Sequence, residues 1–201
     1  PILHSFYHTI LQPTQAEFRD RGSKFIAYAY PITGIAEFKE KLAALKKEHP
    51  KAVHHCFAYR IGMDGNVFRV SDDGEPSGSA GRPILGQIDS KELTNVVVIV
   101  VRYFGGTLLG VPGLINAYKT VTQEALANAA VIQKPVLVNY RLQFDYSRMN
   151  DVMRLVKQFD CAVYKQETLL FCLLEIGIPI NESDRALEKL NELRGVESEK
   201  I

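Results

Sequence analysis

The spacing of apolar residues divides the chain into two parts with different patterns. In the first part, four short runs rich in β-branched and aromatic residues predict strands: 24–31, 54–61, 67–71 and 95–103. Three segments with apolar residues at helical spacing predict helices: 36–48, 83–88 and 114–128. Because 95–103 is apolar at nearly every position, we expect it in a mixed sheet that is covered on both faces. The first part is therefore predicted to be an α+β layer.

The second part alternates strands and helices more regularly. Four segments predict strands: 137–145, 161–166, 169–176 and 195–199. Two segments predict helices: 147–159 and 183–193. The order β-α-β-β-α-β in about 65 residues is typical of a ferredoxin-like fold, with the apolar run 169–174 expected in its core. That fold hosts many activities, so it assigns no function.

A change of composition marks the boundary between the two parts. Glycines cluster between Gly62 and Gly113, and we place the boundary between Ala130 and Leu137, with 133–135 as a short linker. The predicted domains are 1–134 and 135–201. Charge differs between them as well: 15 Lys/Arg minus 12 Asp/Glu gives +3 before Leu137, and 9 minus 11 gives −2 from there on.

Overall composition narrows the class of protein. The net charge of +1 argues against a strongly basic nucleic-acid binder but allows a local basic patch. No apolar run is long enough to span a membrane, and the first residues lack the pattern of a signal peptide. Three cysteines, an odd number, favour reduced thiols over a disulfide framework. We therefore expect a cytoplasmic protein with no membrane partner.

Two glycine-rich segments, 71–85 and 101–114, carry the candidate chemistry. Each combines glycines and hydroxyl groups with an arginine and leads into a predicted helix, as phosphate-binding loops do. Neither has the spacing of a Walker or dinucleotide loop, and tight turns would explain the glycines equally well. The candidate ligand-binding residues are Arg60, Asp72, Asp73, Glu75, Ser77, Gly78, Ser79, Gly81, Arg82, Arg102, Tyr103, Phe104, Gly105, Gly106, Thr107, Gly110, Gly113 and Lys119.

Two smaller groups of residues have alternative interpretations. Asp72, Asp73 and Glu75 would suit a divalent metal or acid–base chemistry, but a solvated turn is the simpler interpretation. His54 and Cys56 share one face of a predicted strand, as a metal pair or a Cys–His nucleophile would, or as an ordinary half-buried pair. We predict no catalytic residue, metal or cofactor.

Four blocks of sequence resemble the Impact/YigZ family: 21–27, 52–60, 71–85 and 102–118. The resemblance implies an N-terminal α/β sandwich like the second domain of ribosomal protein S-five and domain IV of elongation factor G. It also implies a C-terminal ferredoxin-like domain like domain V of that factor. The expected fold class is therefore α+β with two domains. Such folds commonly bind RNA or ribosomal surfaces, although the same superfold includes small-molecule kinases.

The leading hypothesis is a non-catalytic protein that binds RNA or the ribosome in translation regulation, with a translation factor as a further partner. Arginine side chains and loop amides would bind phosphates, while Tyr103 or Phe104 stacks on a base. One alternative is an enzyme acting on a phosphorylated small molecule or nucleotide, using the glycine-rich loops and the acidic cluster. Another alternative is a homo-oligomer that pairs through the loops. Both the RNA-binding hypothesis and the enzyme hypothesis require the two glycine-rich loops to meet at one site.

Overall fold

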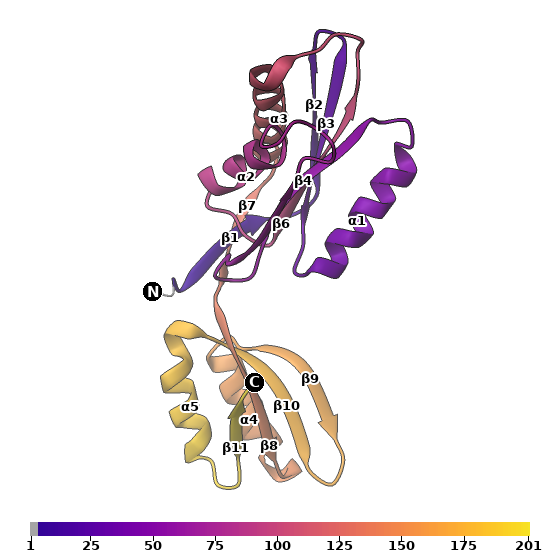
Figure 1. The fold of residues 1–201 in the computed structure, drawn as a ribbon. Helices are drawn as coiled ribbons and strands as arrows, with labels where there is room; N and C mark the ends of the chain where they lie inside the picture. The colour runs from indigo at the N-terminus through magenta and orange to yellow at the C-terminus, as the bar shows by residue number, and fades with distance from the viewer. Residues whose placement is uncertain (1–3) are drawn as a thin grey trace. The chain divides into compact units, whose positions relative to one another are not determined.

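The computed structural model describes residues 4–201, which form two compact units (Figure 1). The N-terminal unit comprises Tyr7–Lys134, and the C-terminal unit comprises Pro135–Ile201 together with residues 4–6. The segment 133–135, predicted as a linker, belongs instead to strand β7 (Val131–Pro135), which pairs with β1 (Phe6–Ile10). Each unit has its own hydrophobic core.

A five-stranded sheet forms the centre of the N-terminal unit. Its strands are β2 (Thr14–Asp20), β3 (Ser23–Pro31), β4 (His54–Ile61), β5 (Val67–Ser71) and β6 (Val96–Tyr103), in the order β2-β3-β6-β4-β5. Each of these neighbouring pairs is antiparallel, so the expectation of a mixed sheet is wrong. The predicted bounds of β4 and β5 are confirmed.

Helices cover both faces of this sheet (Figure 1). Helix α1 (Ile35–Glu48) lies on one face, and α2 (Gly81–Ser90) and α3 (Gly110–Ala127) lie on the other. Alternate residues of β6 therefore enter different cores, Val98 with α2 and α3 and Val97 with α1. This double cover explains why an antiparallel strand is apolar nearly throughout its length.

The C-terminal unit has the predicted order of elements. Its strands are β8 (Leu137–Phe144), β9 (Ala162–Thr168), β10 (Cys172–Pro179) and β11 (Glu197–Lys200), in the antiparallel sheet order β11-β8-β10-β9. Two short 3-10 turns precede the helices, Tyr146–Arg148 before α4 (Met149–Gln158) and Ile180–Glu182 before α5 (Ser183–Glu192). Both helices contribute to one core on a single face of the sheet.

One core prediction in this unit is wrong for its first three residues. The run 169–174 is expected in the core, and Cys172 and Leu174 are buried there, but Leu169 and Leu170 are 79% and 96% exposed because β10 begins only at Cys172. Cys172 pairs with Thr168 of β9, so the three residues between them form the hairpin turn. A turn at the end of a sheet has no neighbouring layer to cover its side chains.

Candidate functional site

The two glycine-rich segments meet at one end of the N-terminal sheet. We call residues 72–80, between β5 and α2, the acidic loop, and residues 104–109, between β6 and α3, the glycine loop. Glu75 of the acidic loop forms an ion pair with Arg102, two residues before the glycine loop (2.7 Å, Nη1 to Oε1). The hydroxyl of Ser23 accepts hydrogen bonds from Arg102 Nη2 (3.3 Å) and from the Gly105 amide (3.2 Å). The site therefore joins both loops and the start of β3.

The carboxylate of Glu75 is the centre of this arrangement. Arg102 Nη1 donates to both of its oxygens, at 2.7 and 2.8 Å, and the Tyr118 hydroxyl donates to Oε2 at 2.7 Å. His54 Nε2 lies 3.1 Å from Oε1. The side chains of Glu75 and Arg102 are only 3% and 6% exposed. Arg102 therefore neutralises an internal carboxylate. The sequence had instead suggested that it faces an external phosphate.

Cys56 and His54 both touch this cluster, but they do not pair with each other. The Cys56 thiol donates to the Asp72 carbonyl oxygen at 3.1 Å and lies 3.4 Å from the Tyr118 hydroxyl. His54 Nδ1 lies 2.6 Å from the Asp73 carbonyl oxygen. Burial raises the pKa of Cys56 and of Tyr118 well above their ordinary values. A buried, protonated thiol without a base beside it is not an activated nucleophile.

Asp72 occupies the start of helix α2. Its Oδ2 accepts from the Gly78 amide at 2.9 Å, and its Oδ1 accepts from the amides of Ala80 (3.1 Å) and Gly81 (2.9 Å). Burial on its own would raise the pKa of Asp72, but the three amide hydrogen bonds together lower it. The backbone amides predicted to bind phosphate in this loop are therefore occupied by an internal anion.

The three acidic side chains of this loop have separate partners. Asp72 caps α2, Glu75 pairs with Arg102, and Asp73 Oδ2 accepts from the His55 amide at 2.7 Å. Within residues 4–201, no group of three acidic, histidine or cysteine side chains is arranged to hold a metal ion. Each of the three carboxylates therefore serves a separate contact within the protein.

Replacing Asp72 by Asn tests the capping role. Asp72→Asn keeps one accepting oxygen but replaces the other, which accepts from the Gly78 amide, by an NH₂ group, so we expect the free energy of unfolding to fall by about 1 kcal/mol near neutral pH. Because the folded protein lowers the pKa of Asp72, this stabilisation is fully present above the unfolded-state pKa and is lost as the pH falls through the folded-state pKa. Urea denaturation of both proteins at neutral and acidic pH measures the difference. A difference that does not shrink on acidification contradicts this account.

The glycine loop lies against the turn between β2 and β3. A Cβ atom added to Gly105 would lie 2.0 Å from the carbonyl carbon of Gly22, so only glycine fits here. Arg21 Nη2 donates to the carbonyl oxygen of Leu109 at 3.2 Å, beside the start of α3. Leu109, the residue before α3, has no capping side chain, and the first turn of α3 contains no acidic residue. Unlike at the start of α2, no carboxylate among residues 4–201 is hydrogen-bonded to the amides at this helix start.

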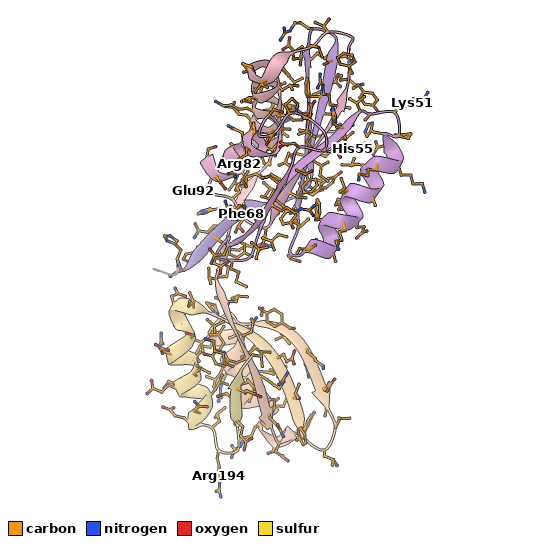
Figure 2. All side chains as sticks on the ribbon, viewed as in Figure 1. Lys51, His55, Phe68, Arg82, Glu92 and Arg194 are labelled. Atoms are coloured by element: carbon orange, nitrogen blue, oxygen red, sulfur yellow. The ribbon has the colours of Figure 1, made fainter. Side chains whose placement is uncertain are left out.

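Exposed side chains surround the glycine loop. Phe104 is 48% exposed and Leu108 is 82% exposed. Arg82, in the first turn of α2 (Figure 2), and Lys119 on α3 are exposed, and within residues 4–201 neither forms an ion pair. Of the predicted loop residues, the following are exposed as well: Ser77, Gly78, Gly106, Thr107 and Gly110.

Several predicted site residues lie elsewhere or serve packing. Arg60 pairs with Val96 at the other end of the sheet, about 20 Å along the strand from Arg102, and binds Asp89 at 2.9 Å. Tyr103 points to the opposite face, where its hydroxyl lies 2.6 Å from His49 Nδ1. Buried or closely packed positions account for the rest: Ser79, Gly81 and Gly113.

Sequence reasoning missed Ser23 and Tyr118 as members of the site. Tyr118 lies on the buried stripe of α3, four residues after the buried Leu114. A phenol in an otherwise apolar stripe requires a hydrogen-bond partner, and this was the available signal. Ser23 carried no signal, because its contacts depend on the approach of the β2–β3 turn to the glycine loop.

The sequence and the structure were compared with those of known proteins. The family model of the Impact N-terminal domain matches residues 21–126. The chain is 35% identical over 161 residues to the IMPACT family member YigZ of Escherichia coli (strain K12), covering 79% of each protein. A crystal structure described as that of a hypothetical protein covers 99% of this chain and 98% of its own, with 30% identity and a TM-score of 0.80.

A further solved structure, that of the two-domain translational regulator Yih1, is 32% identical and covers 60% of this chain and 45% of its own. Its TM-score of 0.36 is too low for a comparison of the folds. Among residues 4–201, no helix is both long and apolar enough to cross a membrane.

Proposed function

This chain belongs to the IMPACT family, and we propose that its N-terminal unit binds RNA, through the glycine loop and the start of α3, without catalysing a reaction. Translation regulation, which the family resemblance implies, is the proposed setting, with ribosomal RNA or RNA bound to a translation factor as the ligand.

The observation that carries this proposal is the contrast between the two helix starts. At α2 the amides are occupied by Asp72, whereas at α3 no side chain of the described residues 4–201 caps the helix and Arg21 lies beside it. Uncapped amides and a neighbouring guanidinium are a favourable site for a phosphate. The exposed ring of Phe104 offers a stacking surface for an unpaired base. Because Tyr103 faces the other side of the sheet, Phe104 is the aromatic residue assigned to this role.

The charge of the unit sets the expected strength of binding. With a net charge of +3 over the residues before Leu137, the unit is far from strongly basic. Few phosphates are contacted in this proposal, so both the affinity and its dependence on salt are modest. Binding at the ribosome would add contacts from the larger partner.

Arg21→Ala tests the phosphate contact. Fluorescence anisotropy with an unstructured RNA of about 20 nucleotides, at low and moderate salt, measures the affinity. Because a charge-assisted hydrogen bond is lost, we expect binding about tenfold weaker and a salt slope smaller by about one. Phe104→Ala is expected to weaken binding of unstructured RNA more than binding of an RNA hairpin.

Lys39→Ala is the matched control, because it removes an exposed cation from α1 on the other face of the sheet. Thermal melts establish that each variant is folded. Absence of salt-dependent RNA binding by the unchanged protein, or an equal loss of affinity in the Lys39 control, overturns the proposal.

A further inference from the structure

A cavity of about 360 Å³ lies at one end of the C-terminal unit, and every residue that lines it belongs to this unit. Strand β8 begins and β10 ends here, because Leu137 pairs with Pro179. The end of α4 and the start of α5 contribute to the lining, together with Phe6. The volume is close to the lower limit of ligand pockets, so the cavity suits a molecule smaller than a nucleotide.

Aromatic rings and prolines form the apolar part of this lining: Phe6, Phe159, Pro135 and Pro179. Phe159 is buried, and the guanidinium of Arg185 lies 5.5 Å from the centre of its ring. Phe6 is 43% exposed, and within residues 4–201 no cation lies against its ring. The face of an aromatic ring attracts cations, so the exposed ring of Phe6 suits a second positive group, supplied by a ligand.

The carboxylate of Asp160, which also lines the cavity, has no partner among the described residues. Asp160 follows the end of α4 with a positive φ of 51°, and the Cys161 amide donates to the Val156 carbonyl oxygen at 2.9 Å. Glycine is the usual residue at this position of a helix end, and a negative charge there is unfavourable for the helix dipole. The carboxylate therefore stabilises neither the helix end nor another side chain of residues 4–201.

The charges of the lining indicate the charge of the ligand. Arg185 Nη1 lies 3.5 Å from Glu182 Oε2, so these two charges offset each other and Asp160 leaves the lining with a net charge of −1. A phosphate or carboxylate would be repelled by Asp160. A metal ion is disfavoured as well, because it requires several oxygen ligands and much of the lining is apolar. An organic cation is complementary to both the charge and the apolar walls.

We propose that this cavity binds a small organic cation, a primary ammonium group attached to an apolar body. The ammonium group donates hydrogen bonds to the Asp160 carboxylate and lies against the ring of Phe6. The apolar body packs between Pro135 and Pro179. This inference does not depend on RNA binding, because every residue that lines the cavity lies outside the glycine loop and α3.

Isothermal titration calorimetry of the full chain with 2-phenylethylamine tests the proposal. The neutral counterpart is 2-phenylethanol and the anionic counterpart is 3-phenylpropanoate, so the three probes differ mainly in charge. We expect saturable binding of the amine with a Kd of about 1 mM or below. The alcohol and the carboxylate are expected to bind at least about tenfold more weakly, because they lose the charge-assisted hydrogen bond.

Asp160→Asn tests the residue that carries the proposal. Asparagine accepts the left-handed conformation, so the variant removes the charge without changing the helix end. We expect the amine to bind at least about tenfold more weakly, while thermal melts show a variant no less stable than the unchanged protein. Asp184→Asn is the matched control, because Asp184 is exposed in the first turn of α5 and does not line the cavity.

Three results overturn the proposal. The first is the absence of saturable binding of 2-phenylethylamine up to about 10 mM. The second is equal binding of the amine and the alcohol, which would mean that the cavity does not recognise charge. The third is an equal loss of affinity in Asp160→Asn and in the Asp184 control, which would assign the effect to the charge of the whole unit.

Discussion

Arg102→Met is expected to lower the free energy of unfolding by about 3–5 kcal/mol, because it leaves the Glu75 carboxylate buried without its cation. Glu75 is 3% exposed at its side chain and receives two hydrogen bonds from Arg102 Nη1. Tyr118 and His54 remain beside the carboxylate, but neither replaces a permanent positive charge. Urea denaturation of the full chain measures the loss.

The matched experiment removes the negative charge as well. Glu75→Gln combined with Arg102→Met replaces the buried ion pair by neutral groups of similar size, so we expect the double variant to recover most of the lost stability. The coupling energy from the double-mutant cycle is then large. If the double variant is as unstable as the sum of the single variants, the two side chains act independently and the central role of the ion pair is wrong.

Gly105→Ala is the second change with a large expected effect, of about 3 kcal/mol in the free energy of unfolding. The added Cβ would lie 2.0 Å from Gly22 C and 2.3 Å from Ser23 N. Both neighbours are backbone atoms, so relief requires the β2–β3 turn to move away from the glycine loop. Thermal or urea denaturation measures the effect.

Gly86→Ala provides the control for this substitution. Gly86 lies within α2, and a Cβ there meets no atom within 4 Å. The higher helix propensity of alanine is expected to stabilise the protein by up to about 1 kcal/mol. Equal effects at Gly105 and Gly86 would contradict the steric argument.

The sequence predicted the bounds of β4 and β5 well, but it predicted the edge strand β2 and the start of helix α3 poorly. The bounds of β4 and β5 follow from strand-forming residues interrupted by the glycine-rich turn 62–66. Strand β2 was missed because it is an edge strand whose alternate residues are polar and exposed. Helix α3 begins at Gly110, four residues before the prediction, because proline is accepted in the first turn of a helix.

For the candidate site, residue types were informative but partners were not. Both loops, Arg102 and the carboxylates of the acidic loop were identified from the chain alone. That Arg102 would bind Glu75, 27 residues away, depends on how the sheet brings the loops together. The sequence therefore suggested external phosphates for groups that internal anions occupy, as Asp72 shows at α2. Which distant charged side chains pair with one another is known only once the fold brings them together.

The contact between Gly22 and Gly105 also has a consequence for motion. The β2–β3 turn and the glycine loop touch through backbone atoms, without a flexible side chain between them. Ser23 and Arg102 extend this rigid connection to the acidic loop. Local opening of one segment therefore requires the others to open, so all three behave as one cooperative unit in the native ensemble. A ligand that holds the glycine loop would slow the fluctuations of the acidic loop without touching it.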